Sequence, residues 1–535
     1  MHQFKSAFFF IMLAGSIHAA PVAPTDAGQL LQDSQRSGAS ATPMQQLEGL
    51  TLHGAPLSDS AEGGPKVLLK KLNLFGNTIF DYDQLLTVLG PDTLGKEYDL
   101  AGLKNLANRI SIYYRDNGYP FARAFIPAQE FDAGELTIGL LEGRYGEVRT
   151  TGDHSLSSVT QGFLMNVRPD VVIDSPKLER SMLLLSDQPG VDVIPVMQPG
   201  SEVGKGDLMV SVREGKRYSG SVGLDNFGNR YSGRNRASAA LNANGLLMAG
   251  DDLWFNLFRT DEETWLGQAE YEIPLGFSGL RASIGYSHLS YVLGAEFDGN
   301  GFLGTATTRS LELSYPLIRS LSHNVIILGK YDVTKYSDER VGIRDTKEGD
   351  GYQLGIQFDN RDDIYGGGIT YGNIFKVEGD IRQSSGVVTD SFNVYKGQLA
   401  RQQNFPGNFS LFTSLNGQYS DRSVDGSEQL ALGGAYGVRA YPQGEGSGST
   451  AWVGQIELRY NLDSYQPFVF YDLGNRLNVD EEESRYLSGT GLGVRYKTEK
   501  LYFDLLSAWK VNGGDSLADS EQENYRIWFK TGMNF

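Results

Sequence analysis

The chain of 535 residues contains no cysteine, only six histidines and more acidic than basic side chains. Without cysteine it can form no disulfide, no thiolate metal site and no cysteine nucleophile. The histidines show no paired spacing, and we expect neither a bound metal nor a cofactor. The net charge of −18 argues against a nucleic-acid partner, because counterion release at phosphates needs clustered lysine and arginine.

Long apolar runs are also missing beyond residue 20, where no stretch approaches the roughly 20 residues with which a helix spans a bilayer. A membrane helix is therefore excluded there. One shorter run lies near residue 10: Lys5 precedes the apolar residues Ala7 to Leu13, and small residues follow up to Ala19. This layout predicts a secretory signal peptide over residues 1–19, with a buried N-terminal helix as the alternative.

Glycine and aromatic residues are abundant, with 66 glycines, 28 tyrosines and 27 phenylalanines. In an exported chain this mixture suits many turns and membrane-interface aromatics better than a compact helical enzyme. Residues 20–64 are poor in large apolar side chains, so we expect mostly a linker. Within it, Asp26 to Arg36 is either a short polar helix capped by Asp26 or a segment without fixed structure.

Two similar α/β modules follow, at residues 65–144 and 145–216. In the first, the pattern predicts a strand at Lys66 to Phe75, a short helix at Asp81 to Leu89, a longer helix capped by Asp99, and two closing strands. The second module repeats this β-α-α-β-β order. The segment GELTIGLLEGR at 134–144 aligns without gaps with GDLMVSVREGK at 206–216, a period of 72 residues. We interpret the two modules as copies of one unit.

Residues 217–535 show no helical pattern, and apolar and polar residues alternate strictly in short segments such as 269–273 and 455–462. Aromatic residues such as Tyr271, Tyr315 and Tyr460 stand at segment ends, which favours a membrane barrel with an apolar outside over a soluble sheet. At about 20 residues per strand and loop, the length predicts on the order of 16 strands around a hydrated lumen. The predicted fold class is α+β repeats followed by a C-terminal 16-stranded antiparallel transmembrane β-barrel.

Two short motifs near the end of this region predict a contact inside the barrel. GVRAYPQGEGSG at 437–448 lies in a loop between a strand expected to end near Leu432 and one beginning near Trp452, and its Arg439 has no adjacent acidic residue. In PFVFYDLGN at 467–475, alternation places Phe470 and Asp472 on the face toward the lumen. If the loop folds inward, Arg439 pairs with Asp472 beside the Phe470 ring; otherwise Asp472 is an ordinary hydrated carboxylate of the lumen.

These features together resemble the TpsB transporters of two-partner secretion, the haemolysin activator or ShlB-like family, over essentially the whole chain. The modules are similar to POTRA domains. The tetrapeptide Val438, Arg439, Ala440, Tyr441 resembles the Val-Arg-Gly-Tyr/Phe tip of the family's inward-folded sixth extracellular loop. Ala440 departs from the usual glycine and leaves less freedom for an unusual backbone angle.

The resemblance assigns roles to further residues. By it, Arg439 contacts Asp472 of the F-x-D motif, which begins at Phe470, and holds the loop inside the barrel. The N-terminal helix at residues 20–64 plugs the resting pore. Phe535, on the apolar face of the last alternating segment, resembles the terminal aromatic that the barrel-assembly machinery recognises.

The resemblance also implies a function. The chain would be a bacterial outer-membrane transporter, not an enzyme, whose periplasmic POTRA domains recognise an unfolded exported protein and whose barrel passes it to the cell surface. Its partners would be a large secreted adhesin, haemolysin or toxin, outer-membrane lipid and the barrel-assembly machinery, and we expect a monomer. The alternative is a general outer-membrane insertase of the same superfamily, although such insertases usually carry more than two POTRA copies.

Overall fold

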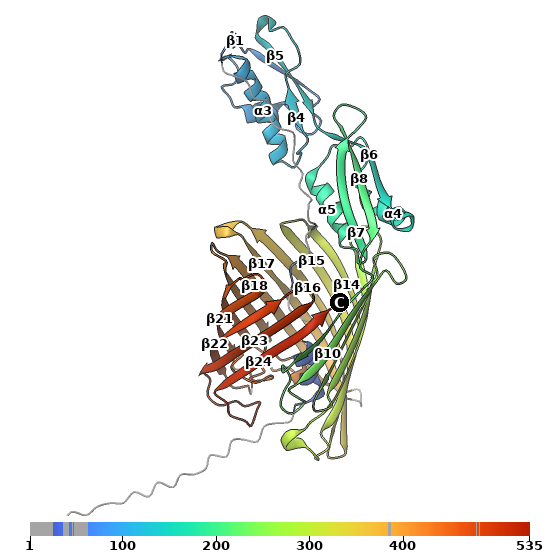
Figure 1. The fold of residues 1–535 in the computed structure, drawn as a ribbon, viewed down its shortest axis with the longest axis vertical. Helices are drawn as coiled ribbons and strands as arrows, with labels where there is room; N and C mark the ends of the chain where they lie inside the picture. The colour runs from blue at the N-terminus through green and yellow to red at the C-terminus, as the bar shows by residue number, and fades with distance from the viewer. Residues whose placement is uncertain are drawn as a thin grey trace, which may run out of the picture.

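The structure of the protein, a computed structural model, describes residues 25–35, 42–44, 47, 63–383, 387–477, 479–480 and 482–535. Two small α/β units follow one another above one end of a large barrel (Figure 1). The predicted signal peptide at 1–19 lies outside the described residues. In the described part of the chain, every helix is too short or too polar to cross a membrane.

The first unit is a three-stranded sheet, ordered β2-β5-β4, on which two helices pack. Its elements are β1 (Val67–Leu68), β2 (Lys71–Phe75), α2 (Tyr82–Leu89), β3 (Glu97–Tyr98), α3 (Leu100–Asp116), β4 (Arg123–Phe125) and β5 (Glu135–Leu141). Asp81 and Asp99 cap the two helices through hydrogen bonds from the N–H groups of Gln84 and Gly102, both 2.8 Å. The strand predicted from Lys66 is divided into β1 and β2.

The second unit repeats this architecture with the sheet order β6-β8-β7. Its elements are β6 (Arg144–Gly152), α4 (His154–Thr160), the 3-10 helix η2 (Gln161–Leu164), α5 (Ser175–Ser186), β7 (Val191–Pro199) and β8 (Lys205–Glu214). The last strand of each unit lies in the middle of its sheet, parallel to one neighbour and antiparallel to the other. The buried residues of β5 recur in β8 at the predicted spacing: Leu136, Ile138 and Leu140 correspond to Leu208, Val210 and Val212.

Sixteen antiparallel strands form the closed barrel, which confirms the predicted architecture. They are β9 (Tyr218–Asp225), β10 (Arg236–Asn244), β11 (Asp252–Thr260), β12 (Trp265–Pro274), β13 (Arg281–Val292), β14 (Leu303–Arg319), β15 (His323–Arg340), β16 (Ile343–Asp362), β17 (Gly368–Gln383), β18 (Val388–Asn404), β19 (Phe409–Tyr419), β20 (Ala451–Tyr460), β21 (Tyr465–Arg476), β22 (Arg485–Lys497), β23 (Leu501–Asn512) and β24 (Tyr525–Asn534). Strand β24 pairs with β9 and closes the cylinder. Phe535 continues this pairing, since its N–H donates to the Gly220 carbonyl at 3.0 Å.

Apolar side chains point outward from the barrel wall, where they face lipid. On β16, Leu354 and Ile356 are exposed on the outer surface, and the ring of Tyr352 lies 4.7 Å from that of Tyr331 on β15. At the end of the barrel nearer the α/β units, the ring of Tyr460 lies 4.7 Å from that of Phe409. Aromatic rings on neighbouring strands are thus in contact beside these apolar residues, as the alternation predicts for a membrane barrel.

A short helix, α1 (Ala27–Gln35), lies inside the barrel. Its N–H at Ala27 donates to the Asp338 carboxylate of β15 at 3.0 Å, and Asp26 accepts a bond from the N–H of Gln29 at 2.8 Å. Leu30 and Leu31 are buried against apolar side chains of the barrel wall. Of the two alternatives for Asp26 to Arg36, the structure has the capped helix, while Arg36 lies outside the described residues.

The first unit depends on a buried carboxylate directly after β5. Glu142 accepts hydrogen bonds from the N–H groups of Thr78 and Ile79, at 2.5 and 2.9 Å, and from the Tyr114 hydroxyl at 3.0 Å. Burial opposes the charged form, but these hydrogen bonds outweigh it and lower the pKa of Glu142. The equivalent residue of the second unit, Glu214, has an exposed side chain.

We expect Glu142→Gln to destabilise the first unit by about 2 kcal/mol, because three hydrogen bonds lose their charged, buried acceptor. Unfolding of the full chain in urea, followed by the helical circular dichroism signal, measures this effect, with Glu214→Gln as the matched control. Because the folded-state pKa lies below the ordinary 4.5, the contribution of Glu142 is present above that pH and is lost as the pH falls further. Equal effects of both variants, or an unchanged difference in acid, would contradict this role.

Candidate functional site

The loop between β19 and β20, residues 420–450, folds into the barrel. It is the sixth loop at the end of the barrel away from the α/β units, and β19 ends at Tyr419, so the expected strand end near Leu432 is wrong. The chain turns inward because its apolar side chains find partners there. Val438, Ala440 and Tyr441 are each fully buried, in one cluster with side chains of β21 to β23.

Main-chain hydrogen bonds between residues of the loop give it a fixed shape. The N–H groups of Leu432 and Gly433 both donate to the Glu445 carbonyl at 2.9 Å, and the Val438 N–H donates to Leu432 at 2.8 Å. Gly434 has a φ of 109°, which only glycine adopts without strain. At Gly437, an added Cβ would lie 2.2 Å from the Leu432 carbonyl oxygen, so the reversal there requires a glycine.

Arg439 at the tip of the loop is buried and bonds to two carboxylates of the barrel wall. Its Nε and Nη2 donate to the two oxygens of Asp472 at 2.8 and 2.7 Å, and its backbone N–H donates to the same carboxylate at 3.0 Å. Its Nη1 donates to Glu457 on β20 at 2.5 Å. Such a fork of charge-assisted bonds holds the tip of the loop in one position and orientation.

The wall beside Arg439 is shaped to receive it. The guanidinium lies over the Phe470 ring, 3.6 Å from its centroid. On the neighbouring β22, Gly489, Gly491 and Gly493 leave a trough, because a Cβ at Gly491 would lie 2.3 Å from the Phe470 ring. A Cβ at Gly489 would lie 2.5 Å from the methyl group of Ala440. The trough therefore accepts both the ring and the loop tip.

The other residues of the tip tie it to different strands. The Tyr441 hydroxyl donates to the Asn512 carbonyl at the end of β23, 2.8 Å away. The Trp528 indole of β24 donates to the Arg439 carbonyl at 2.7 Å. Ala440 does not adopt a positive φ, so replacing glycine at this position brings no backbone strain. Val438 is fully buried in the same cluster.

Glu457 was not predicted as a site residue, although it joins three arginines. Besides Arg439, it accepts bonds from Arg459 Nε at 2.8 Å and from Arg495 Nη1 at 3.0 Å. The alternation of β20 indicates that Glu457 and Arg459 face the lumen, and the same reasoning applies to Arg495 on β22. This alternation applies to many residues of the lumen, so it does not distinguish Glu457, Arg459 and Arg495 from the others.

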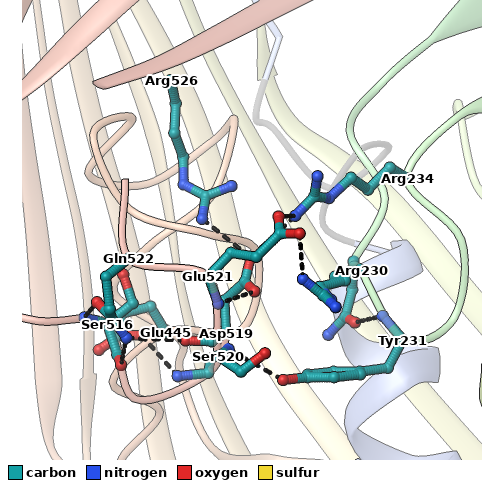
Figure 2. Close-up of polar contacts among 12 residues, drawn as sticks. Arg230, Tyr231, Arg234, Glu445, Ser516, Asp519, Ser520, Glu521, Gln522 and Arg526 are labelled. Atoms are coloured by element: carbon teal, nitrogen blue, oxygen red, sulfur yellow. Dashed lines mark hydrogen bonds and ion pairs between the residues drawn. The ribbon is translucent and has the colours of Figure 1, made fainter. Parts of the chain in front are cut away.

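A second carboxylate, Glu445, anchors the far side of the loop and was also missed. It accepts bonds from the N–H groups of Leu517 and Ala518 at 2.9 and 2.8 Å and pairs with Arg485 at 2.5 Å. Figure 2 shows how the contacts continue from this neighbouring loop, residues 513–524, to the loop between β9 and β10.

The contacts between those two loops are mainly ionic. Arg234 donates to Glu521 at 2.6 Å and pairs with Asp519 at 3.3 Å, and the Ser520 N–H donates to the Tyr231 hydroxyl at 3.1 Å (Figure 2). From strand β24, Arg526 also pairs with Asp519 at 3.0 Å. Through Glu445, the inward loop is thus connected to both sides of the β24–β9 closure. Among the described residues, the structure has no group of three histidine, aspartate or glutamate side chains that could hold a metal ion.

Comparison with known families identifies relatives of the chain. The family model described as haemolysin secretion/activation protein ShlB/FhaC/HecB matches residues 204–496, more than half of the chain. A model of the ShlB-type POTRA domain matches residues 67–143.

Individual proteins agree with these matches. The heme/hemopexin transporter protein HuxB of Haemophilus influenzae (strain 86-028NP) is 28% identical over 73% of this chain and 72% of its own. The outer membrane transporter CdiB of Dickeya dadantii is 23% identical over 92% and 90%. Among solved structures, CdiB from Escherichia coli aligns with a TM-score of 0.77 at 18% identity, covering 96% of this chain and all of that one. BamA from Haemophilus ducreyi, lacking POTRA domains 1–3, aligns with a TM-score of 0.53 at 12% identity over 87% of this chain.

We expect Arg439→Ala to release the inward loop while the barrel stays assembled. Loss of the guanidinium leaves the buried Asp472 without its cationic partner and destabilises the closed loop by about 3 kcal/mol, so cleavage by an added protease should rise about a hundredfold. Strand pairing is untouched, and the heat-modifiable migration of the folded barrel should persist. Arg459→Ala is the control, because Arg459 also binds Glu457 but belongs to the wall. Equal protection of the loop in both variants would contradict the proposed anchoring.

Proposed function

Because the chain belongs to the haemolysin secretion/activation family ShlB/FhaC/HecB, it is an outer-membrane transporter of two-partner secretion, and we propose that it captures one large secreted protein, unfolded, in the periplasm. The POTRA domains of this family face the periplasm. Transporters of the family work with large secreted partners, and we infer an adhesin, a haemolysin or a toxin for this one. The single observation behind the proposal is the position of the α/β units directly over a barrel whose lumen holds a folded loop and a helix (Figure 1).

Capture is proposed to occur at the second POTRA unit, residues 145–216, next to the barrel. A cavity of about 1210 Å³ lies between this unit and the barrel mouth, lined by apolar residues such as Leu184 and Val193 from α5 and β7. Strand β7 is one of the two edges of the sheet and the one whose residues line this cavity, but Pro195 and Pro199 lack N–H groups. An added strand would therefore find few donors on β7, which favours binding of an extended segment in the groove between β7 and α5.

Passage through the barrel requires α1 and the inward loop to move, because both occupy the lumen. We propose that the exported chain displaces them and that its folding at the cell surface makes the movement irreversible. The proposed cycle contains no chemical step catalysed by this protein. The protein acts as a monomer, in contact with outer-membrane lipid, and Phe535 serves as the recognition signal for the barrel-assembly machinery.

Deletion of the transporter should remove one large protein from the culture medium and leave the other outer-membrane proteins at normal levels. Quantitative proteomics of the secreted and outer-membrane fractions measures both. The deletion strain complemented with the intact chain is the control. A general loss of barrel proteins from the outer membrane would instead identify an insertase.

Arg439→Ala and Asp472→Ala should each reduce export of that protein by about tenfold or more, because each removes one partner of the buried Arg439–Asp472 pair and unseats the loop. Export is measured as the ratio of secreted to periplasmic partner at equal amounts of assembled barrel. Arg459→Ala should export normally. Normal export by both loop variants would contradict a role of the pair in transport.

A further inference from the structure

A short piece of the N-terminal linker crosses the rim of the barrel nearest the POTRA units. Met44 is held there through its main chain on both sides. Its N–H donates to the Asp359 carboxylate of β16 at 3.0 Å, and its carbonyl accepts a bond from Arg361 Nη2 at 2.7 Å. Two residues earlier, the Thr42 carbonyl accepts a bond from Gln357 Nε2 at 3.2 Å. Alternate residues of β16, Gln357, Asp359 and Arg361, thus bind the main chain of the linker.

These three bonds reach main-chain atoms, and the Met44 side chain takes part in none of them. Every residue except proline offers the same N–H and carbonyl pair, so such a grip is independent of the sequence bound. The bonds to Asp359 and Arg361 are charge-assisted, which roughly doubles the strength of an ordinary hydrogen bond. The two side chains also bond to each other at 2.7 Å, so each is held in place when the other is engaged.

A continuous series of hydrogen-bonded polar side chains connects Asp359 to the second POTRA unit. Asp187, at the end of α5, forms two bonds with Arg319 of β14, both 2.7 Å. Arg319 in turn donates to the side-chain oxygen of Asn324 at 3.1 Å, and the Asn324 amide donates to Asp359 at 3.0 Å. Arg319, Asn324 and Asp359 are all buried. The position of Asp359 is therefore tied to the POTRA unit from which an exported chain would arrive.

The linker also reaches the apolar side of this route. Leu47 packs against the core of the second POTRA unit and, with Met44, lines the cavity between that unit and the barrel mouth. Described residues of the linker thus lie both in the proposed capture groove and at the rim below it. The path that they mark is the one that a captured segment must take into the lumen.

We propose that Asp359 and Arg361 form a clamp for the main chain of an extended polypeptide, occupied at rest by the linker around Met44 and during transport by the exported partner. This inference rests on the proposed function for the identity of the second occupant. Because the clamp binds only main-chain N–H and carbonyl groups, it guides a polypeptide of any sequence toward the lumen.

A synthetic peptide of residues 40–47, SATPMQQL, tests the clamp directly on the purified full chain. The chain carries Leu47→Asp, so that its own linker competes weakly, and binding of the labelled peptide is followed by fluorescence anisotropy. N-methylation of the peptide at Met44 removes the N–H and should weaken binding about tenfold, whereas alanine in place of Met44 should leave it unchanged. In Asp359→Ala protein the N-methylated and native peptides should bind equally weakly.

Asp362→Ala is the matched control variant. Asp362 lies three residues further along β16 and pairs with Arg401 at 2.8 Å, so it forms another ion pair at the same rim. It makes no hydrogen bond to the linker residues that the structure describes. It should retain both native binding and the tenfold effect of N-methylation. Three results would contradict the clamp: equal binding of the native and N-methylated peptides, equal loss of peptide affinity in Asp359→Ala and Asp362→Ala, or no binding of any peptide. The linker would then be only a tether between α1 and the first POTRA unit. Because this measurement needs no export, peptide binding without a secretion defect in the deletion strain would instead refute the proposed function alone.

Discussion

The arrangement of the barrel interior depends on one buried cation. Arg439 lies in the lumen away from water, and a buried charge persists only when its partners satisfy it. Asp472 and Glu457 supply those partners, and the Phe470 ring covers the guanidinium face. A buried ion pair of this kind adds little net stability but discriminates strongly between positions, since any other placement leaves charges unpaired. It therefore fixes where the sixth loop lies more than it strengthens the barrel.

Three segments lie inside the barrel or at its rim, and each is held mainly by a different kind of contact. The loop is held by buried ion pairs, α1 by apolar packing around Leu30 and Leu31, and the linker at the rim by main-chain hydrogen bonds. The difference suits their proposed roles. Ion pairs return the loop to one position, while main-chain bonds at Asp359 and Arg361 can pass from one extended chain to another without loss, because every chain carries the same groups.

Much of the fold follows from local rules. Side chains of a strand alternate between two faces whatever its neighbours are, so the lipid-facing residues of β12, β16 and β20 were predictable without any pairing partner. Helix caps are equally local: Asp99 caps α3 as predicted, and Asp81, predicted as the first residue of the short helix, caps α2. Two strand boundaries were wrong where contacts with distant residues decide. The strand from Lys66 breaks because the Lys70 N–H bonds to Gly134, and the strand expected to end near Leu432 ends at Tyr419, because the inward loop that follows buries its apolar side chains.

For the candidate site, the sequence alone determined that Arg439 needs a distant acid and that Asp472 faces the lumen, because both statements rest on residue chemistry and strand period. Only the tertiary structure decided that Glu457 shares the guanidinium, that Glu445 binds the backbone at Leu517, and that the rim of β16 holds the linker. These contacts join segments as much as 317 residues apart. Their geometry follows from the register of sixteen strands and the closure of the barrel, and no local pattern encodes that register.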